Sequence, residues 1–351
     1  MNSKNISKHP ALPTCTDQLL WDTWLSSFHL PTLTISDEIG LFPYLENRQA
    51  SMDEIATKFN LSSRAAEAIL VVLTSLGYLA QHQGRYSLSE TSRNFLLPSS
   101  DYYWGGVLKV FRDNPITHAG LIDAISQDKS RQGPTAGSDL PNTEPWEKGD
   151  LPPEMAKNFT GLMHSHSFPA AMGLGRQGFF QGINRLLDVA GGSGCFCIAM
   201  AYFHPEIQCS ILELPPVCAL ANDYIQRYNL QDRINTIPSN MFTDPFPTGY
   251  DAVLFANIFH DWNEEQCLHL GTKAFEALPS GGRIFLHEML LNDAKDGPVP
   301  AASFSIAMLK ATKGKQFTAQ ELESVLNRSG FIDVSINHSY GYYSLTSAKK
   351  S

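Results

Sequence analysis

The sequence contains no apolar run long enough to cross a bilayer. Its longest, residues 68–80, is interrupted by Thr74 and Ser75 and is shorter than the roughly 20 residues that a transmembrane helix needs. Positive charge is also in deficit, because 26 Lys and Arg stand against 35 Asp and Glu, a net charge of −9. General attraction to nucleic acid or to an anionic membrane surface is therefore not expected. No charged-then-apolar leader opens the chain, so we expect a cytoplasmic protein.

Cysteine is scarce, and its spacing does not match a metal site. The chain has six cysteines among 351 residues, and a single residue separates Cys195 from Cys197. A zinc site usually shows a gap of two residues and a second pair of ligands. In a chain without an export signal, scattered cysteines are typically reduced and buried. We therefore expect free thiols and no bound metal.

The feature that stands out is an apolar strand that leads into three glycines and then into an apolar helix. The strand from Leu186 carries Asp188, and the turn after it contains Gly191, Gly192 and Gly194. Glycine lets the backbone turn tightly while a ligand lies against it, and the N–H groups that open the next helix point toward that ligand. We predict the floor of a nucleoside-cofactor site just after Asp188.

A second acidic residue follows at the distance that nucleotide-binding sheets use. Glu213 ends the next apolar strand, where a carboxylate can bind ribose hydroxyls. A dinucleotide fingerprint would have a third glycine at the position of Cys197. The pattern therefore favours a nucleoside cofactor other than NAD.

The C-terminal half alternates strands and helices, which is typical of an α/β fold with a doubly wound sheet that binds ligands at the carboxyl ends of its strands. We assign residues 183–351 to this domain and residues 101–182 to a helical connector that contributes to the substrate pocket. The expected strands are from 186, 208–213, 233–238, 251–257 and 283–290, with an antiparallel pair near 331–338 and 342–348. The expected helices are 102–125, 159–174, 195–204, 216–229, 264–278 and 318–328, with a surface excursion at 127–153 and a long connection at 291–316.

The N-terminal part, residues 1–100, has the pattern of a winged helix. Ser51 and Glu54 form a capping box, a second helix ends at Gly77, and two short strands flank residues 82–84. A winged helix can bind DNA, but the helix at 64–76 is mostly apolar and the charges of the module balance. A DNA-binding regulator therefore stays a remote alternative, and no nucleic-acid partner is expected.

Four segments together resemble the S-adenosylmethionine-dependent O-methyltransferases, in the branch that includes plant phenolic, acetylserotonin and bacterial natural-product enzymes. They are the glycine loop, Glu213-Leu214-Pro215, Asn240-Met241-Phe242 and His260-Asp261-Trp262. The resemblance covers nearly the whole chain. It implies a Rossmann-like methyltransferase sheet, a winged-helix domain that forms a homodimer, S-adenosylmethionine (SAM) as cofactor with S-adenosylhomocysteine (SAH) as product, and a small aromatic acceptor.

The resemblance also implies which residues form the site. The expected cofactor-binding residues are Asp188, Gly191, Gly192, Gly194, Glu213, Leu214, Asn240, Met241, Phe242, Ala256 and Asn257. The expected acceptor-binding residues are Phe159, Met163, His166, Asp261, Phe304 and Met308. For Phe304 and Met308 an ordinary place in the core remains an alternative, because a stripe of Met and aromatic residues more often belongs to the core. For His164 a pocket and a solvated helix face remain equally open. Three cofactor-site residues depart from the family pattern: Ala190 replaces glycine, Asn240 replaces aspartate, and Ala256 replaces the lysine of plant members.

His260 and Glu288 are the expected catalytic pair, because each stands near the end of one of two adjacent strands. A phenol with a pKa near ~10 and a histidine near ~6.5 differ by about 3.5 units, or roughly 5 kcal/mol for the proton transfer. A carboxylate that holds one ring nitrogen would orient the imidazole as general base. Gln316 stands where the family carries a second glutamate, so Glu288 would act alone.

Other interpretations remain open at this point. His260 could merely cap the following helix. Some relatives methylate carbon or nitrogen, and some bind SAM without transferring its methyl group.

Overall fold

The computed structural model describes residues 13–127 and 143–351. By the density of its internal contacts, the chain divides into two compact units, Met1–Asp101 and Tyr102–Ser351. None of the described helices combines the length and the apolar character needed to span a membrane.

The N-terminal unit consists of helices around a small antiparallel sheet. Its strand order is β1-β3-β2. The predicted capping box is present, because the Ser51 hydroxyl accepts a hydrogen bond from the Glu54 N–H while Glu54 accepts one from the Ser51 N–H. The elements are α1 (Gln18–Ser26), α2 (His29–Glu38), α3 (Leu41–Leu45), β1 (Ala50–Ser51), α4 (Met52–Phe59), α5 (Ser63–Ser75), β2 (Leu79–His82), β3 (Arg85–Leu88) and α6 (Glu90–Phe95).

The second unit is built on a seven-stranded sheet of order β6-β5-β4-β7-β8-β10-β9. The first five strands in this order are parallel, and β10 is antiparallel to both β8 and β9. This is the predicted doubly wound arrangement with a terminal hairpin. The strands are β4 (Arg185–Val189), β5 (Gln208–Glu213), β6 (Ile234–Pro238), β7 (Ala252–Ala256), β8 (Arg283–Met289), β9 (Phe331–Tyr340) and β10 (Tyr343–Lys350).

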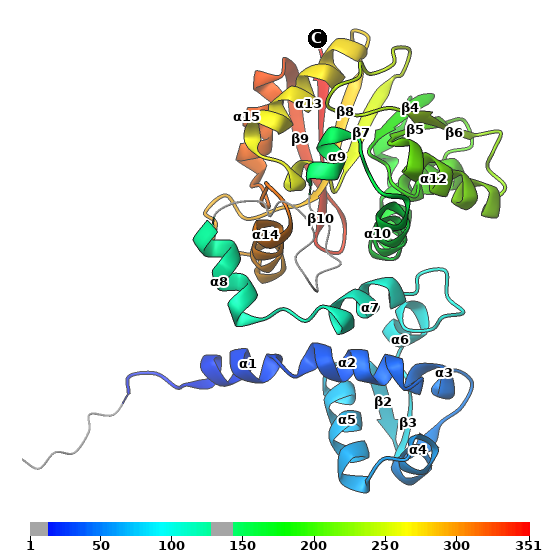
Figure 1. Ribbon diagram of the computed structural model, residues 1–351, viewed down its shortest axis with the longest axis vertical. Coiled ribbons are helices and arrows are strands. Elements are labelled where there is room, and N and C mark those ends of the chain that lie inside the picture. Colours follow the sequence, from blue (N-terminus) through cyan, green and yellow to red (C-terminus); the bar gives the residue numbers. More distant parts are fainter. Residues whose placement is uncertain (1–12, 128–142) are drawn as a thin grey trace, which may run out of the picture. The chain divides into compact units, whose positions relative to one another are not determined.

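Helices cover both faces of this sheet, since alternate residues of each strand point to opposite sides. Leu186 belongs to the core beneath one helical layer, and its neighbour Leu187 belongs to the core on the other side. Figure 1 shows α12 on one side of the sheet and α13 and α15 on the other. The helices are α11 (Cys195–Phe203), α12 (Pro215–Arg227), α13 (Glu264–Ala277) and α15 (Ala319–Arg328), with 3₁₀ turns η1 (Gly178–Phe180) and η2 (Phe259–Asp261).

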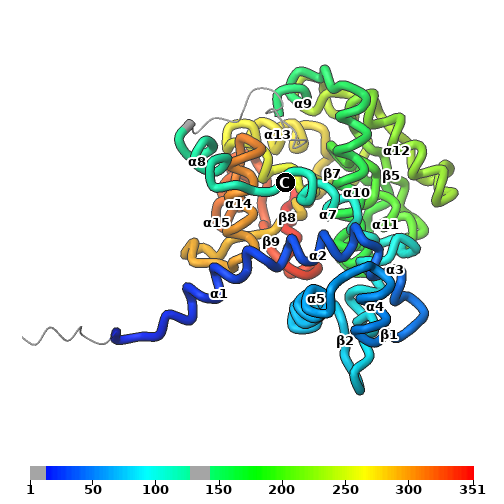
Figure 2. Tube along the Cα trace, turned by 60° about the horizontal axis from the view of Figure 1, so that its bottom comes forward, coloured from blue at the N-terminus to red at the C-terminus, as the bar shows by residue number. Residues whose placement is uncertain are grey.

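The remaining helices of this unit differ from the expectations, which are corrected at three places. The helix predicted at 102–125 is two helices separated at Pro115, which lacks a backbone donor. The connection at 291–316 contains a helix, α14, and both views place α8 beside it (Figure 1 and Figure 2). The bounds are α7 (Gly105–Asp113), α8 (His118–Gln127), α9 (Glu144–Lys148), α10 (Pro153–Gly175) and α14 (Val299–Ala311).

The excursion predicted at 127–153 is the third correction. Residues 128–142 lie outside the described residues, but the rest is not a surface loop. Residues 144–148 form α9, and Thr143 and Leu151 are buried. Trp146 and Leu151 pack in an apolar cluster with Leu214 and Val217. The many Gly and Pro residues of this stretch made it look like a surface loop in the sequence.

Candidate active site

The glycine loop after β4 has the conformation that its sequence predicts. Gly192 and Gly194 have φ angles of +57° and +75°, which L-residues rarely adopt. A Cβ on Gly191 would stand 2.6 Å from Asp188 Oδ2, so the loop is packed tightly on the strand end. A Cβ on Gly192 would meet nothing within 4 Å, because that side of the loop faces open space. Ala190 also has a positive φ of +55°, a strain of about 1–2 kcal/mol that the family's usual glycine avoids.

Glu213 lies across the loop and is fixed by two backbone donors. Its Oε1 accepts a hydrogen bond from the Gly192 N–H at 3.1 Å, and its Oε2 accepts one from the Leu214 N–H at 2.8 Å. Burial raises the pKa of Glu213 to about 7, and these two bonds oppose the rise. The carboxylate is therefore held in one orientation at the end of β5 and keeps free lone pairs for hydroxyl donors.

A cavity of about 290 Å³ opens between these strand ends and the helices above them. The expected cofactor residues that line it are Gly191, Gly192, Glu213, Met241, Ala256 and Asn257. All the expected acceptor residues line it as well: Phe159, Met163, His166, Asp261, Phe304 and Met308. The structure thus brings both sets, from six separate segments of the chain, around one space.

Five expected cofactor residues stand behind the cavity wall instead: Asp188, Gly194, Leu214, Asn240 and Phe242. Asp188 is fully buried and accepts a 3.4 Å hydrogen bond from the Cys197 thiol; burial raises its pKa to about 7. Gly194 and Leu214 precede α11 and α12, and Phe242 packs edge-on against Trp262. The amide of Asn240 bonds to the protein at both ends, which binds neighbouring segments together.

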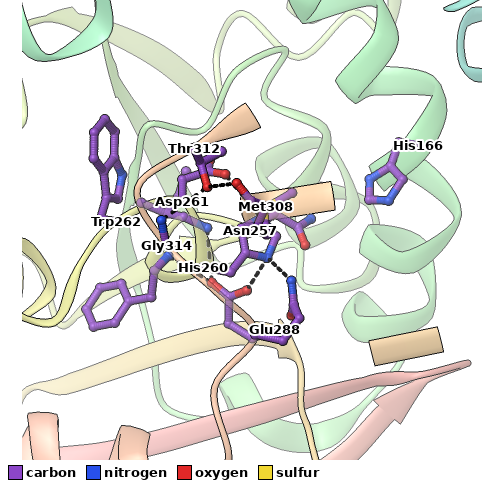
Figure 3. A network of polar contacts seen from close by, with 12 residues as sticks. His166, Asn257, His260, Asp261, Trp262, Glu288, Met308, Thr312 and Gly314 are labelled. Atoms are coloured by element: carbon purple, nitrogen blue, oxygen red, sulfur yellow. Dashed lines mark hydrogen bonds and ion pairs between the residues drawn. The ribbon is translucent and has the colours of Figure 1, made fainter. Parts of the chain in front are cut away.

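His260 and Glu288 form a buried ion pair at the bottom of the cavity, as predicted. His260 Nδ1 lies 2.9 Å from Glu288 Oε2, and their side chains are 4% and 2% exposed (Figure 3). The other carboxylate oxygen accepts hydrogen bonds from the N–H groups of Ile258 and Phe259, at 3.0 and 2.9 Å. The backbone of the turn that carries His260 therefore fixes its carboxylate partner, while Phe304 packs edge-on against the ring.

Charges around His260 decide its protonation state. Burial lowers its pKa, but the carboxylates of Glu288 and Asp261 and the contacts with Glu288 and Gln316 outweigh burial and raise the pKa to about 9. Asp261 Oδ1 lies 3.7 Å from His260 Nε2, the ring nitrogen on the other side from Glu288. Burial raises the pKa of Asp261 to about 6, so this residue is mostly ionised at neutral pH. The ring is therefore mainly protonated at pH 7 and becomes neutral as the pH rises through about 9.

Gln316 shows what the departure from the family pattern does. Its side-chain amide lies 3.2 Å from His260 Nδ1, and the residue is completely buried. A glutamate here would place a third carboxylate beside one imidazole. The amide keeps the contact with the ring and leaves out the charge.

The two histidines of α10 are neutral at pH 7, because burial lowers the pKa of each to about 4. Both nitrogens of His166 contact hydroxyls, with Nδ1 3.2 Å from Ser167 Oγ and Nε2 3.3 Å from Tyr343 Oη. Burial lowers its pKa to about 4, so the ring is neutral at pH 7 and forms part of the cavity wall. His164 is on neither a solvated face nor the cavity wall, because it is buried with Nδ1 2.8 Å from Ser193 Oγ.

Several cavity residues escaped the sequence analysis. Trp146 lies in a stretch without periodicity, which gave no signal. The walls supplied by α7 and α8 had a usable signal, because Val107 and Phe111 are spaced by four residues on a predicted helix. The missed residues include Val107, Phe111, Ile116, Leu121, Trp146, Lys310 and Thr312.

Comparison with known proteins agrees with this geometry. A family model described as an O-methyltransferase domain matches residues 121–332. A 3-hydroxy-5-methyl-1-naphthoate 3-O-methyltransferase from Streptomyces sahachiroi is 34% identical over 323 residues, 92% of this chain and 90% of that protein. An L-tyrosine C(3)-methyltransferase from Streptomyces lavendulae is 33% identical over 313 residues, 85% and 82% of the two chains. Human N-acetylserotonin methyltransferase in complex with SAM shares the fold, with a TM-score of 0.81 at 21% identity over 97% of this chain and 100% of that one.

The charges beside His260 generate a prediction that does not depend on turnover. Gln316→Glu adds a carboxylate next to the ring, so the pKa of His260 should rise further. Glu288→Gln keeps an oxygen for the backbone donors but removes the charge, so the pKa should fall. An NMR titration of the imidazole, assigned with a His260→Asn variant, measures both. Shifts in the same direction in the two variants would contradict the account.

Proposed function

The chain belongs to the SAM-dependent O-methyltransferase family, and we propose that it methylates a hydroxyl of an aromatic or enolic small molecule and releases SAH. The observation that carries this proposal is the buried His260–Glu288 pair, which opens onto a cavity that begins at a nucleoside-type glycine loop. The naphthoate relative acts on a hydroxyl of an aromatic acid, which supports an acceptor of this kind.

The residues at the glycine loop fit the cofactor. The open side of Gly192 leaves room for a ligand against the backbone, and Glu213 presents a carboxylate held ready for ribose hydroxyls. Met241, Ala256 and Asn257 would complete the contact with it. When bound, SAM supplies a methyl carbon that its sulfonium makes electrophilic.

His260 would remove the acceptor proton through Nε2, while Glu288 holds Nδ1 and stabilises the imidazolium that forms. A base with a pKa of about 9 faces a phenol near ~10, so the mismatch falls to about 1.4 kcal/mol. An aliphatic alcohol near ~15.7 would still leave a deficit of roughly 9 kcal/mol. The raised pKa thus suits a phenol or enol and disfavours an unactivated alcohol.

The acceptor half of the cavity suits a flat apolar molecule. Phe159 and Phe304 supply aromatic faces, and Met163 and Met308 supply polarisable sulfur that packs well against rings. Such walls exclude water from the site, which strengthens the electrostatic effect of the Glu288 carboxylate on His260.

The proposal assigns different functions to different parts of the chain. Residues 183–351 would bind SAM and supply the base, and residues 101–182 would contribute to the acceptor pocket. A cytoplasmic location agrees with five buried free thiols among the six cysteines. No nucleic-acid or membrane partner is part of the proposal.

Residues 1–100 would form a homodimer. In support, α1 buries none of its residues, although Leu19, Leu20 and Trp24 are 77%, 72% and 58% exposed. A monomer rarely leaves such a patch uncovered. Light scattering should give twice the chain mass, and Leu20→Glu together with Trp24→Glu should give a monomer, because the added charges cannot be buried. A wild type that stays monomeric at micromolar concentrations would contradict this part.

Replacing His260 tests the chemistry. His260→Ala should lower kcat/KM for a phenol that the wild-type protein methylates by about 10²- to 10⁴-fold, because no positioned base remains. Its Kd for SAM, measured by calorimetry, should stay within about twofold of wild type. His82→Ala, which changes an exposed histidine of β2, serves as the matched control.

The product must be examined in the same assay. NMR of the product should place the methyl on oxygen. A methyl on carbon would favour the chemistry of the L-tyrosine C(3)-methyltransferase relative, and a methyl on nitrogen would likewise contradict the proposal. Unchanged turnover in His260→Ala would remove this residue from the mechanism.

A further inference from the structure

Helix α9 is connected to both ends of the cavity by two polar contacts of a single residue, Glu147. Its main-chain carbonyl accepts a 2.9 Å hydrogen bond from the Nδ2 group of Asn240, which follows β6 on the cofactor side. Its carboxylate forms a 2.5 Å ion pair with the Lys313 ammonium, which follows α14 on the acceptor side. Two segments that are far apart in sequence therefore hold the same short helix.

The hydrogen bond between Asn240 and the Glu147 carbonyl requires a side-chain amide at position 240. Asn240 Oδ1 already accepts a hydrogen bond from the Phe242 N–H at 2.9 Å, so its Nδ2 group is the part that reaches α9. Gly149, with φ at +72°, ends the helix directly against this amide, and a Cβ there would lie 3.1 Å from Nδ2. An aspartate has no donor for the carbonyl of Glu147, and its charge would repel that oxygen.

The tie to Lys313 continues into the catalytic turn. The Lys313 N–H donates a 3.1 Å hydrogen bond to the carbonyl of Asp261. The next residue, Gly314, packs so closely on this turn that a Cβ would lie 2.6 Å from the Trp262 nitrogen. Figure 3 shows Gly314 among the residues around His260. The position of α9 is thus mechanically linked to the segment that carries the base.

What α9 contributes to the cavity is Trp146. The indole lines the cavity and packs edge-on against Phe159, with 5.0 Å between ring centroids. The same helix rests on a small apolar cluster that includes Leu151, Leu214 and Val217, next to the start of α12. A helix of five residues has little stability of its own, so these contacts and the two polar ties determine where the indole stands.

We propose that Asn240 is a positioning residue that acts through Glu147: it fixes α9, and thereby holds Trp146 as a wall over the bound cofactor. This inference rests on the proposed function, because it assumes that SAM or SAH occupies the cavity. It explains the asparagine at the position of the family's aspartate by the contact with α9 and not by a contact with the nucleotide. Glu147 and Lys313 extend the same restraint to the catalytic turn.

Asn240→Asp is the decisive variant. In the free protein, backbone amides of residues 143–151 should exchange hydrogen about fivefold faster or more, because one restraining hydrogen bond is lost. SAH should dissociate about fivefold faster in stopped-flow measurements. The KM for SAM should rise with it, while kcat at saturating SAM stays within about twofold.

The lysine side of the restraint offers a matched control. Lys313→Met should also raise exchange at residues 143–151 and speed SAH release, and Lys313→Arg should restore both. Lys315→Met removes the same charge two residues away, but Lys315 pairs with Glu321 and not with α9. This control should leave exchange at residues 143–151 and the SAH dissociation rate unchanged.

Two results would overturn the inference. If Asn240→Asp leaves exchange at residues 143–151 at the wild-type rate, Asn240 does not position α9, whatever happens to SAH affinity. If Lys313→Met and Lys315→Met behave alike, the ion pair with Glu147 has no special role. The exchange experiment needs no acceptor, so a protein that methylates nothing but shows the expected exchange would refute the proposed function and leave this inference standing.

Discussion

The ion pair between Glu288 and His260 is the interaction on which the rest of the site depends. Burying a carboxylate or an imidazolium alone costs several kcal/mol, and the structure offsets this by pairing the two and by giving Glu288 two backbone donors. Those donors belong to the turn after β7, and Glu288 belongs to β8, so the pair exists only where these parallel strands lie side by side. The sheet is therefore what brings the two side chains together.

The raised pKa of His260 reflects a balance. Each carboxylate near the ring raises the pKa of His260, which makes proton removal from a phenol easier but leaves less of the ring neutral at pH 7. Glu288 and Asp261 together hold the pKa at about 9, close to that of a phenol. Gln316 keeps a polar contact with the ring without adding a third negative charge. The departure from the family pattern thus limits how far the pKa of His260 is raised.

Local signals in the sequence predicted much of this structure. The alternation of strands and helices after Leu186 gave the doubly wound sheet, the glycine loop gave the position of the cavity, and the strand ends gave the His260–Glu288 pair. The capping box at Ser51 was also correct. These features depend on residues close together in sequence or on the regular geometry of parallel strands.

Contacts between distant segments were not predictable in this way. The side chain of Asn240 donates a hydrogen bond to a carbonyl 93 residues earlier, on a helix whose sequence shows no apolar periodicity. His164 is buried in part because Ser193 and Tyr224, from later segments, pack against it. The strain at Ala190 is likewise invisible until the loop is folded.

The pH dependence of kcat/KM with a simple phenol tests the central claim most directly. If a buried imidazole with a pKa of about 9 is the base, kcat/KM should rise about tenfold per pH unit from about pH 6 and bend near pH 9, where the free protein loses this proton. A bend near the ordinary histidine value of about 6.5, or no dependence on pH at all, would contradict the account.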